Sequence, residues 1–288
     1  MAGHGVAVTI IPTLGERRRG ARVRMAPMNA NETPARRRSR RQETRLWRVP
    51  VVRVERITPH MARVTVQGDS LADLAGAGTD QNVMLYFYPD DVVLPEPLTL
   101  ESARGLWSQV RPLTRTYTIR RHDPATNEVD FDFVLHGDSG PASAWAERAK
   151  VGDELIFVGP SPAYQPDPAA DWYLLAGDET ALPAITAILG ALPEGKQALA
   201  FVEVADAAEE HPGHAITWLH RDGVPAGEST VLVDAIRAAE LPDGLPEVWM
   251  AGERTAMLAV RAHLLDERGY PRQRVRPTTY WRLGESGN

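Results

Sequence analysis

The sequence predicts two domains, an antiparallel six-stranded β-barrel followed by an α/β domain with a parallel sheet. Three observations predict this fold class. From Leu46 the chain alternates apolar and polar residues in short runs separated by turns, which is typical of antiparallel strands. In its second half, short apolar runs alternate with helical spacing, which indicates a parallel sheet. A proline-rich stretch at 160–168 separates the two patterns, so we expect domains at 46–165 and 166–288.

The composition excludes several classes of protein. The chain has 288 residues, of which 43% are hydrophobic and 24% charged, as in globular proteins. It has no cysteine, which excludes a disulfide scaffold, a thiolate zinc site, a cysteine nucleophile and a cysteine-ligated iron–sulfur cluster. No uninterrupted apolar stretch approaches the ~20 residues that span a bilayer. The weakly apolar residues 6–14 precede the arginines, which is the reverse of the order in a secretory signal. We therefore expect a soluble, cytoplasmic protein that does not insert into membranes.

The first 45 residues form a basic arm. They hold eleven arginines and three glutamates, a net charge of +8, so the remainder carries −14. We expect a disordered Arg-rich extension over 1–45. Two alternatives are a nucleic-acid-binding tail and a translation start at Met25 or Met28. The arm has no aromatic residues before Trp47 to stack on bases, so we expect no nucleic acid partner.

Six strands are predicted in the barrel. Turns separate the strands, such as Thr58-Pro59-His60 between the first and second strands and 122–127 between the fourth and fifth. One helix is predicted after Pro141. The strands are expected at 48–57, 62–67, 82–88, 115–121, 128–135 and 154–158. Short antiparallel strands in this number favour a closed barrel.

Four strands are predicted in the second domain. They are expected at 171–176, 197–204, 215–219 and 247–251, with helices at 181–192 and 253–268. A barrel followed by such a sheet is the layout of flavin reductases, which carry the flavin on the barrel and a pyridine nucleotide on the sheet. Fold alone is weak support for a function, so the motifs must supply the argument.

The first motif is Arg115-Thr116-Tyr117-Thr118 on a predicted barrel strand. Residues two apart on a strand share a face, so Arg115 and Tyr117 point together and Thr118 points the other way. An arginine beside an aromatic ring can neutralise a pyrophosphate and stack on a flat heterocycle. An ordinary half-buried strand with an outward arginine would have the same four residues.

The second motif, 136–145, follows the next hairpin. Gly140 stands at a turn and Pro141 at a helix start, with His136 before them and Trp145 one turn into the helix. Backbone N–H groups at such a helix N-terminus, together with the Ser143 hydroxyl, can bind an anion without a lysine. A capped helix that merely connects strands is the alternative interpretation.

With these motifs the sequence resembles the siderophore-interacting proteins, which are FAD-dependent ferric-siderophore reductases of the ferredoxin-reductase type. The motifs occur in the family order and cover roughly residues 46–284. They are the Arg-x-Tyr-Thr strand, His136 with Gly140-Pro-Ala-Ser143 and Trp145, Gly177-Asp-Glu-Thr-Ala-Leu-Pro-Ala-Ile185, Trp218-Leu-His-Arg221, Trp249-Met-Ala-Gly-Glu253 and Tyr280-Trp-Arg-Leu-Gly284.

The resemblance implies FAD on the barrel and NAD(P)H on the sheet. Tyr117 would face the isoalloxazine, Thr118 would lie near its reactive edge, and Arg115, Ala142 and Ser143 would hold the pyrophosphate, while His136, Gly140, Pro141 and Trp145 complete the flavin site. Gly177, Asp178, Glu179 and Thr180, at the carboxyl end of the first sheet strand, would frame the nicotinamide. No side chain has to act as acid or base, because the cofactor carries the chemistry. The expected partner is a ferric siderophore and the expected state is a monomer.

The sequence departs from the family pattern at two positions. Met84 stands where the family usually has a lysine, and Ser161 stands where an arginine is common. Arg282 survives from this basic set, which the family uses to attract acidic siderophores. The substrate is therefore expected to be a less anionic siderophore, or another electron acceptor. Arg120 and Arg121 could compensate.

Three alternatives to a siderophore reductase stay open. One is a flavin reductase for another electron acceptor, the second is a slow-turnover flavin-containing siderophore-binding protein, and the third is a nucleic-acid module built on the arm. For the electron donor, Glu203 or Asp206 near an adenosine ribose would favour NADH, because a carboxylate repels a 2′-phosphate. Arg221, after the next strand, favours NADPH.

Overall fold

The computed structural model describes residues 43–74, 79–136 and 140–285. The chain divides into two units, residues 1–33 and 34–288, and the first of these lies outside the described residues. Most of the basic arm expected to be disordered therefore lies outside them too. Over the residues described, no helix is long and apolar enough to cross a membrane.

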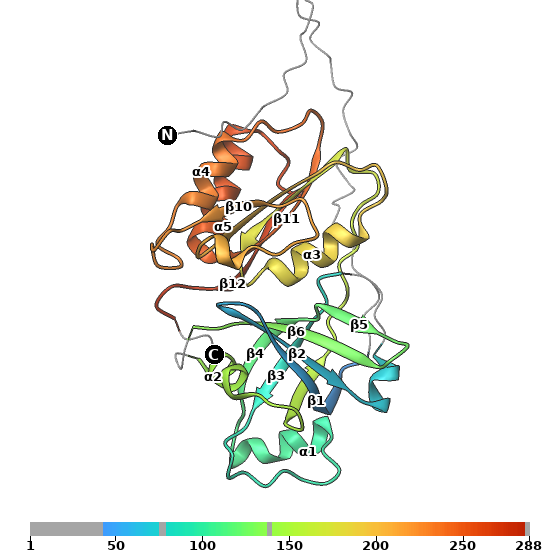
Figure 1. Cartoon of the computed structure of the whole chain (residues 1–288). Coiled ribbons are helices and arrows are strands. Elements are labelled where there is room, and N and C mark those ends of the chain that lie inside the picture. The colour runs from blue at the N-terminus through green and yellow to red at the C-terminus, as the bar shows by residue number, and fades with distance from the viewer. Residues whose placement is uncertain (1–42, 75–78, 137–139, 286–288) are drawn as a thin grey trace, which may run out of the picture. The chain divides into compact units, whose positions relative to one another are not determined.

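The first domain is a seven-stranded antiparallel sheet (Figure 1). Its strand order is β4-β3-β7-β1-β2-β6-β5, and the strand β1 is long enough to pair with β7 through its first half and with β2 through its second. The elements are β1 (Arg45–Thr58), β2 (Met61–Gln67), the 3₁₀ turn Asp69–Asp73, β3 (Asn82–Phe87), α1 (Leu100–Gly105), the 3₁₀ turn Leu106–Ser108, β4 (Leu113–Thr118), β5 (Arg121–Asp123), β6 (Glu128–Val134), α2 (Pro141–Arg148) and β7 (Glu154–Gly159).

The strand expected over 115–121 is divided into two. At Ile119 the backbone N–H still bonds to the Gln81 carbonyl on the β3 side (2.8 Å), whereas the next N–H, from Arg120, bonds to the Asp130 carbonyl of β6 (2.9 Å). The chain thus leaves one partner strand and joins another within two residues. The two edges of the sheet, β4 and β5, are consecutive segments of one bent strand, and this brings the sheet round into the barrel that the alternation predicts.

Large aromatic side chains fill the barrel. Phe157 is fully buried, with its ring centroid 6.1 Å from that of Trp47 and 5.5 Å from that of Phe131. Inward residues alternate with outward ones along each strand, as two-residue periodicity requires. On β6, for example, Val129, Phe131 and Phe133 belong to this core.

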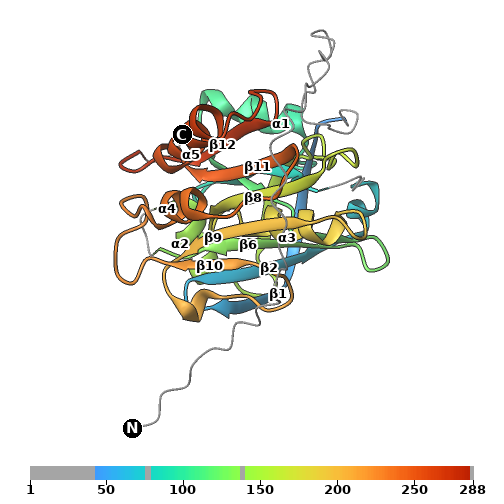
Figure 2. The ribbon, with the colours of Figure 1, turned by 90° about the horizontal axis from the view of Figure 1, so that it is seen from above.

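The second domain is a five-stranded parallel sheet in the order β10-β9-β8-β11-β12, which can be followed in the view from above (Figure 2). Helix α3 packs on one face, against residues such as Leu175 and Val202, and helices α4 and α5 pack on the other, against Leu174 and Val248. The elements are β8 (Trp172–Asp178), α3 (Leu182–Ala191), β9 (Ala198–Val204), the 3₁₀ turn η3 (Ala207–Glu209), β10 (Thr217–His220), α4 (Val231–Ala238), β11 (Pro246–Glu253), α5 (Arg254–Ala262), a π-helical turn (His263–Glu267) and β12 (Val275–Trp281).

The fifth strand was not predicted from the sequence. Tyr280 and Trp281 were expected in a C-terminal segment, but they end β12, which pairs with β11 alone and forms an edge of the sheet. An edge strand tolerates Pro277, because one side of its backbone needs no hydrogen-bond donor. The expected helix at 253–268 begins one residue later and changes to a π-helical turn at His263.

Two core strands approach unusually closely at Gly177. A Cβ atom on this residue would lie 2.4 Å from the carbonyl oxygen of Ala251 on β11 and 2.5 Å from the Cβ of Ala181. We therefore expect Gly177→Ala to lower the free energy of unfolding by about 1–3 kcal/mol through overpacking. Denaturant unfolding followed by circular dichroism measures this.

Gly190→Ala is the matched control. Gly190 lies in helix α3, where a Cβ would meet no atom within 4 Å, so alanine should stabilise the helix by about 0.5–1 kcal/mol. Equal effects of the two substitutions would contradict the close approach at Gly177.

Candidate functional site

The strand β4 presents Arg115 and Tyr117 on the inner face of the barrel. Arg115 lies opposite Leu85 and Tyr117 opposite Val83 on the neighbouring strand β3. Leu85 and Val83 are both buried in the barrel core, and paired residues of an antiparallel sheet share a face. The predicted common face of the arginine and the tyrosine is confirmed. Thr118 is buried opposite Asn82.

Tyr117 belongs to an aromatic cluster. Its ring centroid lies 4.5 Å from that of Phe133, which in turn lies 5.5 Å from that of Trp145 on helix α2. Burial raises the pKa of the Tyr117 phenol. A neutral ring held by two aromatic neighbours presents a rigid apolar surface, on which a flat heterocycle can stack.

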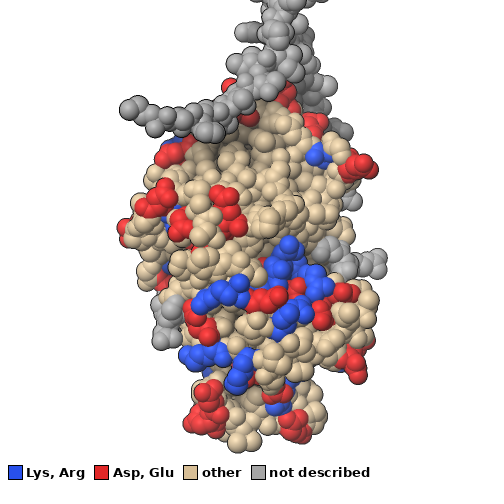
Figure 3. Space-filling view, viewed as in Figure 1, with Lys and Arg blue, Asp and Glu red and all other residues tan. Residues whose placement is uncertain are grey.

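Arg115 differs from the other half-buried arginines of this domain. Arg63 binds Asp132 through two hydrogen bonds of 2.7 and 2.8 Å, and Arg121 binds Asp130 at 2.7 Å. Such pairs explain why basic and acidic side chains lie interspersed on the face seen in Figure 3. Among the described residues no carboxylate lies within ion-pair distance of Arg115, whose Nη1 donates to the Thr114 carbonyl (2.7 Å). A half-buried guanidinium without a carboxylate suits an anionic ligand.

Helix α2 packs against β6, whose Phe133 contacts both Tyr117 of β4 and Trp145 of the helix. Gly140 is its N-cap and, over the described residues, no side chain caps it; Pro141 follows at the first position and has no N–H. The next two backbone N–H groups belong to Ala142 and Ser143, both buried. The positive end of the helix dipole and these N–H groups suit a phosphate. A Cβ on Gly140 would lie 3.4 Å from the His136 ring.

The Ser143 hydroxyl has a structural contact. Its Oγ accepts a hydrogen bond from the backbone N–H of His136 (3.0 Å), which links the end of β6 to the start of α2. His136 itself is exposed. Trp145 packs on Phe133 and on Phe87 (ring centroids 6.0 Å apart), so its observed contacts are those of a core residue. The roles of these residues toward FAD stay predictions.

In the second domain, Asp178 collects hydrogen bonds from three segments. One carboxylate oxygen accepts from the N–H and hydroxyl of Thr180, and the other from the Glu253 N–H (3.0 Å) and the Trp281 indole (2.8 Å). Burial and the neighbouring Glu179 raise the pKa of Asp178 to about 6, which the bonds from Thr180 and Trp281 oppose. Asp178 thus joins the carboxyl ends of β8, β11 and β12.

Glu179 is paired rather than open. Both of its oxygens accept from the Arg221 guanidinium, at 2.7 and 2.8 Å, and a Glu203 oxygen lies 3.5 Å from the same group. Arg221 and Glu203 are 7% and 6% exposed. Glu203 thus lies within ion-pair distance of Arg221 inside the domain, and Asp206 caps the turn η3 through the Ala208 N–H (2.8 Å). These side chains have partners within the protein, and their predicted contacts with a ribose stay predictions.

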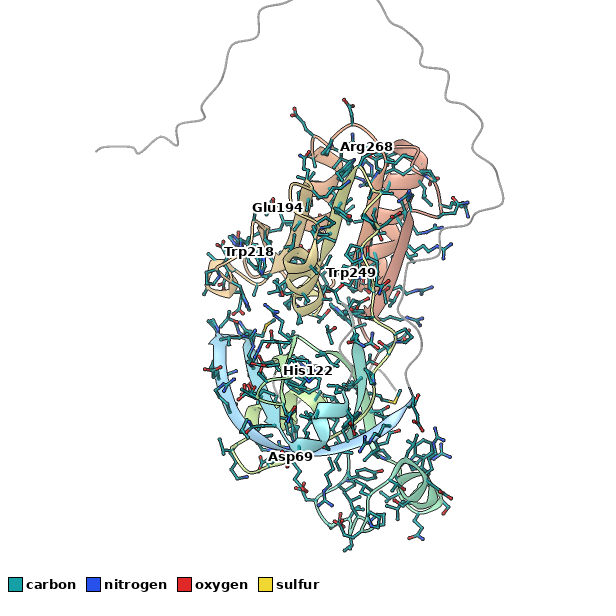
Figure 4. All side chains as sticks on the ribbon, turned by 90° about the vertical axis from the view of Figure 1, so that its right-hand side faces the viewer. Asp69, His122, Glu194, Trp218, Trp249 and Arg268 are labelled. Carbon is teal, nitrogen blue, oxygen red and sulfur yellow. The ribbon has the colours of Figure 1, made fainter. Side chains whose placement is uncertain are left out.

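Glu253 ends a motif noted in the sequence, but its role as an N-cap and hydrogen-bond acceptor at this edge was not predicted. Its carboxylate accepts from the N–H groups of Thr255 and Ala256 at the start of α5, and from the Leu283 N–H (3.4 Å). Glutamate is not among the favoured N-cap residues, so no capping signal marked it. The buried Trp249 of the same strand is labelled in Figure 4.

The residues that depart from the family pattern lie together. Met84 is 43% exposed and lies opposite Thr116 of β4. Thr116 stands between Arg115 and Tyr117 in the sequence, so Met84 and Thr116 lie on the face of the sheet opposite to that of Arg115 and Tyr117. The Ser161 hydroxyl accepts from the Asn82 N–H (2.9 Å), two residues before Met84. Arg282 directly follows β12, is exposed and pairs with Glu285 (3.1 Å).

The buried cluster at this edge predicts a pH dependence. Burial raises the pKa of Glu203 to about 7, although Arg221 opposes this. Because that value exceeds the ordinary 4.5, the folded state binds a proton that the unfolded state has released, and the free energy of unfolding falls as pH rises through 4.5–7. We expect Glu203→Gln to gain stability relative to the wild type across this window, by about 1–3 kcal/mol at pH 8.

Urea unfolding at several pH values measures this difference. Glu240→Gln, at an exposed glutamate of the same domain, is the control and should follow the wild type throughout. A constant offset between Glu203→Gln and the wild type from pH 4.5 to 8 would contradict the raised pKa.

Comparison with known proteins agrees with this architecture. Residues 50–164 match the model of the siderophore-interacting FAD-binding domain, and residues 170–284 match that of the siderophore-interacting protein. The chain is 34% identical over 249 residues to the ferric vibriobactin reductase ViuB of Vibrio cholerae, covering 82% of this chain and 89% of that protein. It is 30% identical over 262 residues to the NADPH-dependent ferric-chelate reductase of Escherichia coli, covering 87% and 98%.

A solved structure gives the same result. The crystal structure of a siderophore utilization protein from T. fusca superposes with a TM-score of 0.73 and 37% identity, covering 85% of this chain and 96% of that one. The expected fold of an antiparallel barrel domain followed by a parallel-sheet domain is confirmed. With these matches over both domains, the chain belongs to the siderophore-interacting protein family.

Proposed function

We propose that this protein is an FAD-dependent ferric-siderophore reductase that uses NAD(P)H to reduce chelated Fe(III) and release the iron. The observation that carries the proposal is the half-buried Arg115, which has no carboxylate partner among the described residues and shares the inner barrel face with Tyr117. The ferric vibriobactin and ferric-chelate reductases that the chain resembles support the substrate class.

The residues of this site fit FAD. Arg115 and the N–H groups of Ala142 and Ser143 would hold the two phosphates, and a dinucleotide uses both of these groups whereas a single phosphate would use half of them. Tyr117, fixed by Phe133, would bind against the isoalloxazine, and the buried Thr118 would lie by its edge. Gly177 to Thr180 would orient the nicotinamide at the carboxyl edge of the parallel sheet.

Bound FAD would accept a hydride from NAD(P)H and deliver its two electrons singly, so that two Fe(III) become two Fe(II) and one proton is released. The chain itself needs no acid or base for this. Its part is to place the two heterocycles together and to exclude water from between them. Fe(II) binds hard oxygen ligands more weakly than Fe(III), which frees the iron.

The protein would act in the cytoplasm, as a monomer and without nucleic acid. Its chelate would carry less negative charge than is usual for the family, because Met84 and Ser161 lie near one another on β3 and beside it, where basic residues are expected. A partner other than a siderophore would leave the flavin chemistry unchanged and alter only the electron acceptor.

The FAD assignment is tested through Arg115. The wild type should be yellow and release FAD rather than FMN on denaturation. Arg115→Ala removes charged hydrogen bonds worth about 1.5–3 kcal/mol, so the dissociation constant for FAD should rise about 10- to 100-fold in fluorescence titration. Arg111→Ala, which changes an exposed arginine just before the strand, is the control and should bind FAD normally. Wild-type affinity in Arg115→Ala would refute the site.

The substrate site is tested through its charge. Arg282 is 47% exposed, so its contribution is modest and screened by salt. We expect Arg282→Ala to raise the KM for an anionic ferric chelate about two- to fivefold, with flavin content unchanged. Met84→Lys should lower the KM for the same chelate more than for a neutral one. Trapping of Fe(II) with ferrozine gives both values, and equal changes for the two chelates would remove Arg282 from the substrate site.

A further inference from the structure

A buried carboxylate of the second domain binds a turn of the first. Glu209, the last residue of the turn η3, is 6% exposed. One of its oxygens accepts from the Thr58 hydroxyl, and the other accepts from the His60 backbone N–H (3.0 Å) and lies 2.7 Å from the His60 Nδ1. These partners lie 151 and 149 positions earlier in the chain, at the end of β1 and in the turn before β2.

Each end of this contact is joined to a candidate cofactor site by a short path. On the second domain, η3 follows β9 directly, and Glu203 of β9 lies in register with Asp178 at the proposed nicotinamide edge. On the first domain, the His60 carbonyl accepts from the Leu135 N–H (2.8 Å), one residue before His136 and the segment leading into α2. Glu209 therefore connects the end of β9 to the proposed flavin segment.

A second carboxylate makes the reciprocal contact. Asp80 belongs to the first domain, is 3% exposed, and accepts from the Trp249 indole of β11 and the Tyr280 hydroxyl of β12, both at 3.2 Å. The next residue, Gln81, accepts through its carbonyl from the Ile119 N–H, which follows Thr118 on the proposed flavin strand. Each domain thus contributes one buried carboxylate that is bound by donors of the other.

The hydrogen bonds to these carboxylates are costly to break. A buried carboxylate that loses its donors keeps its desolvation penalty, so the two domains are held in one arrangement rather than loosely tethered. Hydride transfer needs the reacting atoms about 3–3.5 Å apart, and a displacement near 1 Å can cost about 100-fold in rate. An arrangement fixed at both ends of the domain contact meets this requirement.

We propose that Glu209 is a positioning residue for hydride transfer, with Asp80 as its counterpart on the first domain. The inference rests on the proposed function, because it needs FAD on the barrel and a nicotinamide on the sheet. Glu209 touches neither group and acts through Thr58 and His60. It sets the distance across which the hydride passes.

The test compares two reductants of the same flavin in the full-length, FAD-loaded protein. NADPH must bind the sheet and transfer a hydride across the domains, whereas dithionite reduces the flavin without using the sheet. We expect Glu209→Gln, in which one carboxylate oxygen becomes an amide donor, to slow flavin bleaching by saturating NADPH at least tenfold in stopped flow. Bleaching by dithionite and FAD content should stay as in the wild type.

Glu210→Gln is the matched control. Glu210 is the next residue and pairs with His220 of its own domain (2.9 Å), so this change alters charge in the same loop without touching the first domain. Its bleaching by NADPH should equal that of the wild type. Wild-type rates in Glu209→Gln, or equal slowing with both reductants, would overturn the proposal.

Thr58→Val gives a second reading from the opposite domain. Valine keeps the shape of the buried threonine and removes one donor, so NADPH bleaching should slow in the same direction even if Glu209→Gln folds poorly. An unchanged NADPH rate in this variant would also overturn the inference. Failure of the wild type to bind FAD, or to bleach with NAD(P)H, would refute the proposed function instead.

Discussion

The carboxyl edge of the parallel sheet depends on the hydrogen bonds that the buried carboxylate of Asp178 accepts. A buried charge is tolerated only where donors surround it, and here the donors come from Thr180, Glu253 and Trp281. Asp178, Glu253 and Trp281 end three neighbouring strands, and Thr180 follows the first of them, so these hydrogen bonds fix three strand ends relative to one another. The approach is close: a Cβ on Gly252 would lie 2.7 Å from the same carboxylate.

The pairing of charges also distinguishes the candidate cofactor site of the first domain from the rest of its surface. Along the outer face of β1, β2, β6 and β5, arginines and carboxylates neutralise one another, and Asp130 and Asp132 are buried beneath them. Such pairs need no ligand. Arg115 lies on the inner face of β4, away from these carboxylates, and its charge would go uncompensated without an anion. The other half-buried arginines of this domain are paired with carboxylates. Because Arg115 is not, we propose that a pyrophosphate compensates its charge.

The features that were predicted correctly are those that depend on residues close together in the sequence. Two-residue alternation located the barrel strands and the common face of Arg115 and Tyr117, and Pro141 located the start of α2. The break after Thr118 could not be predicted, because it arises where the chain exchanges β3 for β6 as its hydrogen-bonding partner. Strand β12 was not predicted, because Pro277 and the exposed polar residues of this edge strand interrupt the alternation of apolar and polar residues.

The site residues that sequence reasoning missed share a different property. Asp80 and Glu209 look like ordinary acidic residues of turns, which are usually solvated. Their burial depends on donors that lie 149 or more positions away, so no window of sequence records it. The contact between Glu203 and Arg221, which are both predicted to lie near a ribose, is likewise tertiary and has no signal in the sequence. The partners of these buried charged residues therefore could not be predicted from the sequence.

The charge of the whole chain bears on which chelate the proposed site would accept. Beyond the arm the chain carries a net charge of −14, which repels an anionic chelate at long range, but at physiological salt this field is screened within ~8 Å. Selection must then occur in the last few ångströms of approach. There the outer face of β3 and β4 offers the exposed Met84 and Thr116 rather than cations, and Arg282 already pairs with Glu285. Neither the long-range electrostatic field nor the local surface stabilises a highly anionic ligand. Both favour a chelate whose negative charge is largely cancelled by the metal.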